Sequence, residues 1–274
     1  MGNHRTAWHV LFVASLSEHG APGFQVLAEA PLSSEPLRAD VIVIRRREGP
    51  REDAAARTLR SFWPQVSHTA LIEFKSPSRP LRPGELTKLF GYGGQYHALR
   101  TEEIDSSAEL LLVLVVPSIT PTLMDELRRL RLRVAPVAPG YLRADGRPYE
   151  LLVIELSAVV DADGDELMTI FIRSRMLSLF ATRFMEQHRM TPNAPNNRAD
   201  LEDYHEVVQR WLSSLTPAER LEGLAPSERL EGLSPEQLLL ALPDEVLRGL
   251  ADDYLRGLPA DVQQVVRQRI GRPG

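Results

Sequence analysis

The segment from Leu110 to Val116, LLLVLVV, constrains the fold of this chain more than any other feature. All seven of its residues are apolar. This length is typical of a strand and is too short for a helix that crosses a membrane. Successive side chains of a strand point to opposite faces, so this strand needs apolar cover on both of its faces. Such strands lie at the centre of sheets that have helices on each side. We therefore expect residues 110–116 to form a central strand.

The rest of the first 190 residues alternates between strand-like and helix-like segments. The strand-like segments are 24–32 (FQVLAEAPL), 38–46 (RADVIVIRR), 69–74 (TALIEF) and 149–156 (YELLVIEL). Apolar residues have helical spacing in 8–17, 83–100, 121–132 and 174–187. The polar turn SSEP between the first two strands predicts a hairpin. The alternation predicts an α/β (α+β) domain with a mixed β-sheet flanked by helices.

A segment rich in Pro and Asn, residues 191–200, separates this part of the chain from the C-terminal part. Such a composition is typical of a linker. The predicted organisation is therefore a sheet domain over residues 1–190, a linker over 191–200 and an all-helical tail over 201–274.

The predicted tail contains a nine-residue repeat, seen in LTPAERLEG, LAPSERLEG, LSPEQLLLA and LPDEVLRGL. Thr216 and Ser234 each precede a Pro, and Glu219 or Gln237 follows three positions later, which is the pattern of a capping box. Each unit therefore predicts one short helix, and helices of this length are unstable alone in water.

The leucines of these repeats need a partner surface for the same reason. We expect them to be buried against one another, against the main domain or against a partner, and a second copy of the chain would make the protein a homo-oligomer. They are Leu221, Leu224, Leu230, Leu233, Leu238 and Leu239.

The composition excludes some classes of site. The chain has no cysteine, which rules out disulfides and cysteine-ligated zinc. The apolar run near the N-terminus, Val10 to Ala14, is shorter than the core of a signal peptide. We expect a cytoplasmic protein without a membrane partner.

Charges of opposite sign separate along the chain. Residues 36–100 contain 12 Lys and Arg against 6 Asp and Glu, whereas residues 199–274 contain 8 against 14. This asymmetry allows a polyanion to bind the first part only, and the acidic tail would then compete with that polyanion. A solvated arginine-rich surface explains the same counts.

Glu73 and Phe74 end the third strand-like segment, and Lys75 follows it directly. Glu73 and Lys75 lie two positions apart, so in a strand their side chains point to the same side. Lys75 and Lys88 are the only lysines among 32 basic residues. Lysine carries a compact charge, and its pKa can shift, whereas arginine has a planar guanidinium that stays protonated. The use of lysine at position 75 therefore indicates that the function of this position requires an ammonium. The alternative is an ion pair at the rim of the sheet without a chemical role.

Asp40 stands at the beginning of a neighbouring predicted strand. Two carboxylates on adjacent strands, together with a backbone carbonyl, are ligands that suit Mg²⁺, and water completes its coordination. A lysine ammonium beside them would lie next to a phosphate bound at the metal.

Asp40, the stretch Glu73-Phe74-Lys75 and the order of strands and helices resemble the PD-(D/E)XK nuclease superfamily. Within it, LRADVIVIRR, ALIEFKSPS and GELTKLFGYGGQYH look like the bacterial recombination-promoting nuclease and transposase-like group. The resemblance covers residues 5–190, and position 39 is Ala where the name of the family has Pro. It implies a restriction-endonuclease-like core, to which a variable helical tail is attached.

The resemblance also implies a role for each matched residue. Asp40 and Glu73 would bind Mg²⁺ or Mn²⁺, Phe74 would lend its backbone carbonyl, and Lys75 would be catalytic. The expected activity is that of a metal-dependent endonuclease, a hydrolase that cleaves phosphodiester bonds in DNA. The alternative is an inactive nucleic-acid- or protein-binding module of the same fold, with a tail for interaction or oligomerisation.

Further residues are expected to support this site. The resemblance matches Glu18, on the first helix, and Gln95, on the helix after the third strand, to accessory positions. Binding of DNA without regard to sequence relies on cations that face phosphates. The residues expected in this role are Arg45, Arg46, Arg47, Arg79, Arg82 and Lys88.

The acidic stretch DADGDE, residues 161–166, is interpreted as a turn. Gly164 stands fourth in it, whereas a calcium-binding EF-hand loop needs Gly at the sixth position.

Overall fold

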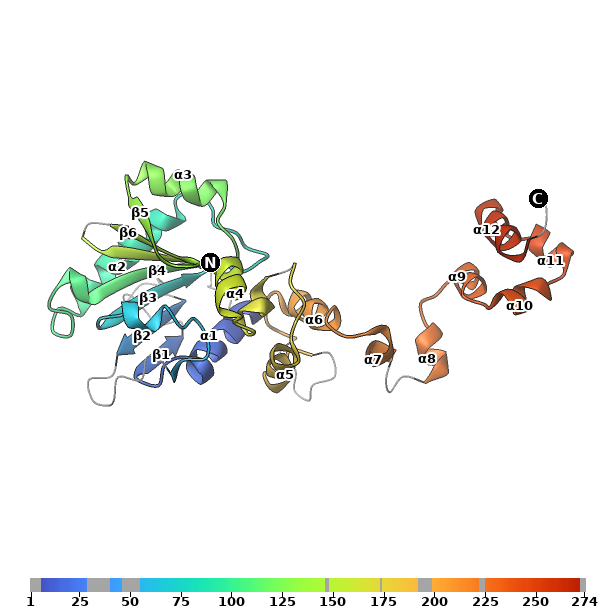
Figure 1. Ribbon diagram of the computed structural model, residues 1–274, viewed down its shortest axis with the longest axis horizontal. Helices are drawn as coiled ribbons and strands as arrows, with labels where there is room; N and C mark the ends of the chain where they lie inside the picture. Colours follow the sequence, from blue (N-terminus) through green and yellow to red (C-terminus); the bar gives the residue numbers. More distant parts are fainter. Residues whose placement is uncertain are drawn as a thin grey trace. The chain divides into compact units, whose positions relative to one another are not determined.

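The computed structural model describes residues 6–28, 40–45, 55–145, 148–172, 174–191, 199–221 and 225–271. The chain divides into two compact units, Met1–Ser214 and Leu215–Gly274. We call the first the sheet unit and the second the tail unit. The sheet unit contains every strand of the described residues, and the tail unit consists of short helices (Figure 1).

A seven-stranded sheet forms the centre of the sheet unit, in the order β1-β2-β3-β4-β7-β6-β5. Strands β3, β4 and β7 run parallel, and the other neighbouring pairs are antiparallel. The bounds are β1 (Phe24–Ala28), β2 (Val41–Arg45), β3 (Thr69–Phe74), β4 (Leu110–Val116), β5 (Arg133–Ala138), β6 (Tyr141–Asp145) and β7 (Glu150–Glu155). The predicted mixed sheet is confirmed.

Strand β4 occupies the middle of this sheet, and all seven of its residues are buried. The expectation drawn from its apolar composition is therefore confirmed. The predicted hairpin also forms, because β1 pairs antiparallel with β2.

Helices cover both faces of the sheet (Figure 1). Leu71 faces the layer that contains α2 and α3, whereas Ile72 faces the layer that contains α1, α4 and α5. Adjacent side chains of β3 thus enter two separate cores, which is why this strand is apolar on both sides. The bounds are α1 (Ala7–His19), α2 (Glu85–Leu99), α3 (Pro121–Arg129), α4 (Leu156–Asp163) and α5 (Leu179–Gln187).

Strands β5 and β6 form a hairpin at one edge of the sheet, which the sequence pattern did not predict. Strand β5 is mostly exposed, contains Pro136 and has a register shift between Pro136 and Ala138. Proline is tolerated at sheet edges because no neighbouring strand needs its missing N–H there. The apolar alternation of this edge strand is too weak to predict a strand from the sequence.

Helix α6 (Tyr204–Leu212) belongs to the sheet unit, whereas the sequence assigned it to a tail that begins at residue 201. Val207 is fully buried in the core that α1 shares, and the Ala7 N–H donates to the Glu202 carbonyl at 2.8 Å. Composition alone placed the boundary at the Pro/Asn segment, but packing places it after Ser214. Residues 192–198, most of the predicted linker, lie outside the described residues.

The tail unit is a succession of short helices, and both predicted capping boxes form in it. Thr216 and Glu219 exchange hydrogen bonds of 2.7 and 3.3 Å, and Ser234 and Gln237 form the same reciprocal pair. The bounds are α7 (Pro217–Leu221), α8 (Pro226–Leu230), α9 (Pro235–Leu240), α10 (Asp244–Arg248), α11 (Asp252–Arg256) and α12 (Ala260–Ile270). Among the described residues, every helix is too short or too polar to span a bilayer.

The expected burial of the repeat leucines holds only in part. Leu239 is buried, together with residues of α10, α11 and α12, in a small aliphatic core. Leu221, Leu230 and Leu233 are exposed, since the described parts of α7 and α8 contribute nothing to that core. Leu238 is half-buried, and Leu224 lies outside the described residues.

Candidate functional site

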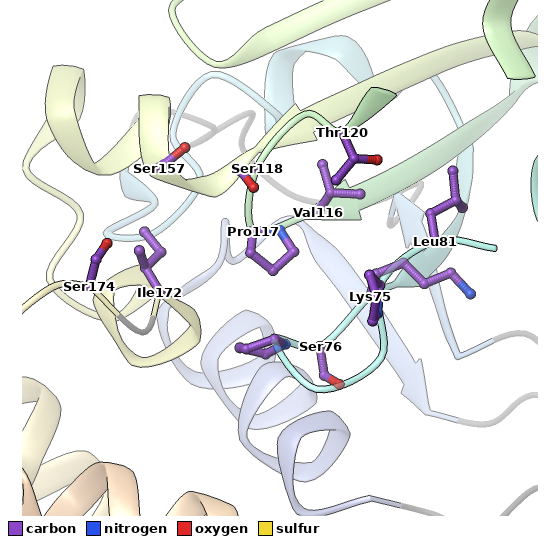
Figure 2. Close-up of a pocket in the computed structure, with 12 residues that line it drawn as sticks. Lys75, Ser76, Leu81, Val116, Pro117, Ser118, Thr120, Ser157, Ile172 and Ser174 are labelled. Carbon is purple, nitrogen blue, oxygen red and sulfur yellow. The ribbon is translucent and has the colours of Figure 1, made fainter. Parts of the chain in front are cut away.

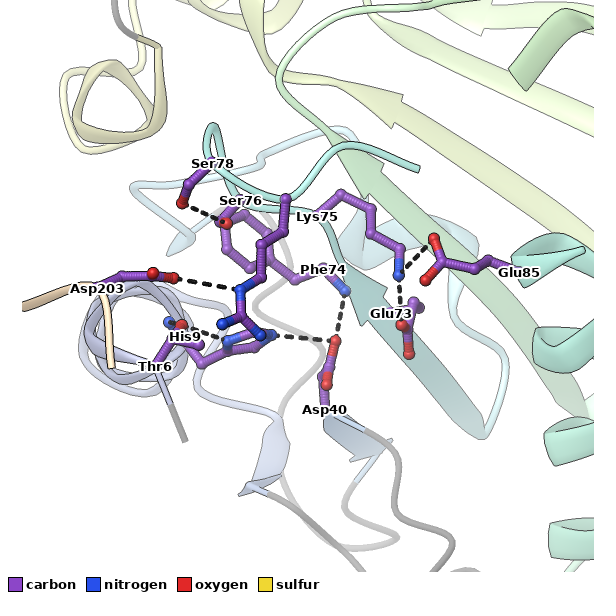
Figure 3. Close-up of polar contacts among 11 residues, drawn as sticks. Thr6, His9, Asp40, Glu73, Phe74, Lys75, Ser76, Ser78, Glu85 and Asp203 are labelled. Carbon is purple, nitrogen blue, oxygen red and sulfur yellow. Dashed lines mark hydrogen bonds and ion pairs between the residues drawn. The ribbon is translucent and has the colours of Figure 1, made fainter. Parts of the chain in front are cut away.

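Asp40, Glu73 and Lys75 come together at the end of β3, where they line a pocket of about 210 Å³ (Figure 3). Strands β2 and β3 pair antiparallel, with Val41 opposite Ile72. Continuing this register by one residue places Asp40 opposite Glu73, and residues directly opposite each other have Cβ atoms about 5 Å apart. The pairing of the two strands is therefore what brings the two carboxylates together.

The carboxylate of Asp40 is held by the neighbouring strand and by α1 (Figure 3). Its Oδ2 accepts a hydrogen bond of 2.9 Å from the Phe74 N–H and lies 3.3 Å from His9 Nε2. The other ring nitrogen of His9 lies 2.6 Å from the Oγ1 of Thr6, the N-cap residue of α1. This chain of contacts restricts the orientation of Asp40.

The ammonium of Lys75 is held between two carboxylates. Its Nζ lies 2.8 Å from Glu73 Oε1 and 3.1 Å from the Oε2 of Glu85, the first residue of α2. Glu73 and Lys75 therefore point to the same side, as predicted. The side chain of Lys75 is only 8% exposed. Lys75 is thus buried and Glu73 is half-buried, at the end of β3.

The electrostatics of this pocket favour an additional cation. Burial and the charge of Asp40 raise the pKa of Glu73 to about 7, although Lys75 acts in the opposite direction. Burial lowers the pKa of Lys75, but Glu73 and Glu85 outweigh it and raise this pKa overall. Burial likewise lowers the pKa of His9, and the contact with Asp40 raises it overall. Two carboxylates repel each other here, and a cation between them would remove the repulsion.

The donor set of the pocket fits Mg²⁺ or Mn²⁺. Asp40 and Glu73 each use one oxygen in the contacts above, and no described residue bonds Asp40 Oδ1 or Glu73 Oε2. The N–H and C=O of one strand residue point to the same side, so the Phe74 carbonyl is directed toward Asp40 as its N–H is. Mg²⁺ commonly takes one or two carboxylates and keeps several waters. Among the described residues, no group of three or more His, Asp or Glu is placed so that it could hold a metal ion.

Arg79 and Arg82 line the same pocket, in the loop between β3 and α2. Arg79 forms ion pairs with Glu202 and Asp203, the two residues before α6. Asp203 has a φ of 62°, a conformation that is uncommon for residues other than Gly. The Arg79 guanidinium at this pocket is therefore already paired with carboxylates of the same chain.

Arg45, which was expected to face DNA, is bonded within the sheet unit. Its guanidinium donates to the carbonyls of Trp63 and Val66 and lies 4.3 Å from the centre of the Phe24 ring. It also stands at the opposite end of β2 from Asp40, about 17 Å away along an extended strand. The Arg45 side chain packs on Phe24 and donates hydrogen bonds to carbonyls of the turn before β3.

The other cations expected to face DNA are placed as follows. Lys88 is exposed on α2 and does not line the pocket. Arg46 and Arg47 lie outside the described residues.

The two accessory residues taken from the resemblance do not reach the site. Glu18 lies near the C-terminal end of α1, where it contacts His188 at 2.9 Å. His9, which does reach the site, is about 13 Å away along the same helix. Gln95 is exposed and does not line the pocket. The residue of α2 that reaches the site is Glu85.

His9 and Glu85 were not singled out from the sequence, and no local signal marks them. Glu85 is an acid in the first turn of a helix, where the helix dipole favours a negative charge in any protein. His9 lies in the first turn of α1, three positions after the cap residue Thr6. Only the packing of α1 and α2 on opposite faces of the sheet brings both side chains to the end of β3.

Comparison of the chain with protein-family models, with curated proteins and with solved structures found no match. A function can therefore be proposed only from the chemistry of the site itself.

Proposed function

We propose that the protein is an endodeoxyribonuclease dependent on Mg²⁺ or Mn²⁺, of the PD-(D/E)XK kind that its sequence resembles. The observation that carries the proposal is the convergence of Asp40, Glu73 and Lys75 in one pocket at adjacent strand ends. Hydrolysis of a phosphodiester spreads negative charge over the phosphoryl oxygens, and a fixed cluster of cations stabilises that charge.

Each residue of the cluster has a distinct task in this proposal. Asp40, Glu73 and the Phe74 carbonyl would hold the metal ion. The bound ion would stabilise charge on the phosphate and lower the pKa of water. Lys75 stays protonated because its pKa is raised, so it supplies a positive charge in a fixed place. Glu85 and Glu73 orient that ammonium from two sides.

A second candidate is a binding module of the same fold that has no catalytic activity. The contact between Lys75 and Glu73 favours it, because the ammonium already neutralises part of the carboxylate charge that a metal would need. In such a module Mn²⁺ would not bind, and DNA or protein binding would not depend on Glu73.

The nuclease proposal is tested by incubating the full chain with supercoiled plasmid at low salt, with Mg²⁺, with Mn²⁺ or with EDTA. We expect nicked and linear DNA with either metal and none with EDTA. Asp40→Asn and Glu73→Gln keep the size of the side chain and should each lose at least about 100-fold in rate. Glu18→Gln removes a carboxylate that lies elsewhere on α1 and should leave the rate unchanged.

Calorimetric titration with Mn²⁺ separates the two candidates. The nuclease proposal requires a site that binds Mn²⁺ in the wild type and is lost in Asp40→Asn. Binding of DNA by a protein that neither binds Mn²⁺ nor cleaves would reject the nuclease and support the binding module.

A further inference from the structure

A second pocket, of about 320 Å³, opens where the three parallel strands end (Figure 2). Lys75 follows β3, Val116 ends β4, and Ser157 lies in the first turn of α4, directly after β7. Ligands of open α/β sheets bind in the crevice outside the carboxyl ends of such strands. The volume is at the small end of the range for ligand pockets, about 300–1,000 Å³.

This pocket shares a wall with the site of Asp40 and Glu73. Lys75, Ser76 and Pro80 line both pockets. Since the Nζ of Lys75 contacts Glu73 in the first pocket, the aliphatic part of its side chain is what lines the second (Figures 2 and 3). A group in the second pocket is therefore an immediate neighbour of any phosphate held in the first.

The lining of the pocket combines apolar surface with hydroxyl groups that can still form hydrogen bonds to a ligand. Val116, Pro117 and Ile172 supply part of the apolar surface. The hydroxyls of Ser118 and Ser174 bond no described residue. The Oγ1 of Thr120 accepts from a backbone N–H at 3.3 Å, so its own proton is free to be donated.

The charged residues of the lining restrict the class of ligand further. Lys75 is the only ionic residue among the described residues of the lining, and its ammonium is engaged outside this pocket. The pocket therefore suits an uncharged group that is partly apolar and has donors and acceptors at its edge.

We propose that this pocket binds one unpaired nucleoside of a DNA strand, next to the phosphate that lies at Asp40 and Glu73. A base offers flat apolar faces and polar edges, and its sugar adds a neutral oxygen. A base stacked in a duplex cannot enter such a pocket, so the strand must present an unpaired or extruded base. The inference rests on the proposed nuclease function for the position of the phosphate, and it narrows the substrate to single strands, strand ends or distorted duplexes.

Binding without cleavage tests this inference. With Ca²⁺ in place of Mg²⁺, so that the two carboxylates do not repel the phosphate, the full chain is titrated against a fluorescein-labelled single-stranded oligonucleotide, the matched duplex, and a single strand of abasic sites. Contacts of a base with the apolar lining and the pocket hydroxyls add to the affinity that the phosphates supply. We therefore expect the single strand to bind at least about 5-fold more tightly than either of the other two.

Two rim substitutions fill the pocket without disturbing the core. Ser118 and Ser174 are exposed, so the double variant Ser118→Phe, Ser174→Phe should keep the fold and its affinity for duplex. It should lose the preference for the single strand. Ser213→Phe, at an exposed serine outside the pocket, is the matched control and should keep the preference.

The outcomes separate this inference from the nuclease proposal. A wild-type preference that the filled pocket abolishes supports the nucleoside site, and it does so even where the plasmid assay finds no cleavage. Equal affinity of the wild type for the three DNAs, or a preference that survives in the double variant, overturns the nucleoside site even where the plasmid is cleaved.

Discussion

The sheet unit and the tail unit differ in what each one buries. The two cores of the sheet unit contain large aromatic side chains, and Trp8, Phe12 and Trp63 are at most 1% exposed. The core of the tail unit consists of a few aliphatic residues around Leu247 and Leu255. The tail helices form from local capping signals, whereas the strands of the sheet unit depend on distant partners.

The difference extends to polar groups. Every buried polar or charged residue of the described chain lies in the sheet unit, including Lys75 and Asp165. Burying a charge is costly unless other groups bond it, and only a large core can hold such a group in place. A buried group of ionisable side chains, such as the one around Lys75, is found where extensive packing compensates for its desolvation. The tail has charges, but they are solvated.

Truncation gives the largest expected effect on this comparison. A chain that ends at Ser214 keeps α6 and should unfold in urea at the same midpoint as the sheet unit of the full chain. A chain that ends at Asn197 exposes the surface that Val207 and Val208 cover, at a cost of about 3–6 kcal/mol. Tryptophan fluorescence measures this, because all three tryptophans lie in the sheet unit. Equal stability of the two truncated chains would show that α6 belongs to the tail.

Asp165 tests the claim that the sheet unit carries its buried charges at a cost. Its carboxylate accepts from the Thr58 hydroxyl, the Leu59 N–H and the Met168 N–H, at 2.9, 2.8 and 3.3 Å. Asp165→Ala leaves these donors unpaired and should lower the free energy of unfolding by about 2–4 kcal/mol. The control is Asp161→Ala, which removes an exposed carboxylate from the same acidic stretch and should cost less than about 1 kcal/mol. Similar losses in urea unfolding would contradict the contrast.

The two lysines allow a comparison of buried and exposed ammonium groups. Lys75→Arg puts a larger planar guanidinium where one ammonium fits between Glu73 and Glu85, so cleavage should fall by about 100-fold. Lys88→Arg makes the same exchange on the exposed side of α2 and should have no effect. Plasmid cleavage at matched protein concentration measures both. Full activity of Lys75→Arg would mean that the position needs only a positive charge.

The smallest expected effect concerns the acidic residues that pair with Arg79. The double variant Glu202→Gln, Asp203→Asn removes the carboxylates that pair with Arg79, so that Arg79 can contact a phosphate. An exposed ion pair is worth up to about 1 kcal/mol. DNA should therefore bind a few-fold more tightly to this variant at low salt. The double variant Glu102→Gln, Asp125→Asn changes the net charge equally at exposed positions away from the pocket. An equal gain in both variants would show that net charge alone is responsible.

Much of the sheet and part of the site could be predicted from the sequence. The apolar run of β4 required a central position, and the two-residue spacing of Glu73 and Lys75 required a common side of β3. The capping boxes at Thr216 and Ser234 are local as well. In each case the signal lies within a few residues, and the geometry of a single strand or helix end is enough to interpret it.

Tertiary packing decided the rest, because the relevant partners are far apart in the sequence. Arg45 was expected to face DNA, but the carbonyls of Trp63 and Val66 take its guanidinium. The sequence places Asp165 in an acidic turn, but in the structure its carboxylate is buried and accepts from the Thr58 hydroxyl and the Leu59 N–H. A charged side chain looks the same in the sequence whether it meets solvent, a phosphate or a buried donor.

The site itself shows the division between the two kinds of information. The sequence by itself determined that a carboxylate and an ammonium share one side of a strand end, and it placed Asp40 at the beginning of a neighbouring strand. Only the tertiary structure brought in His9 from α1 and Glu85 from α2, because these helices pack on opposite faces of the sheet and meet only at the end of β3. Side-chain periodicity is a property of one element, whereas a pocket is a property of how several elements pack.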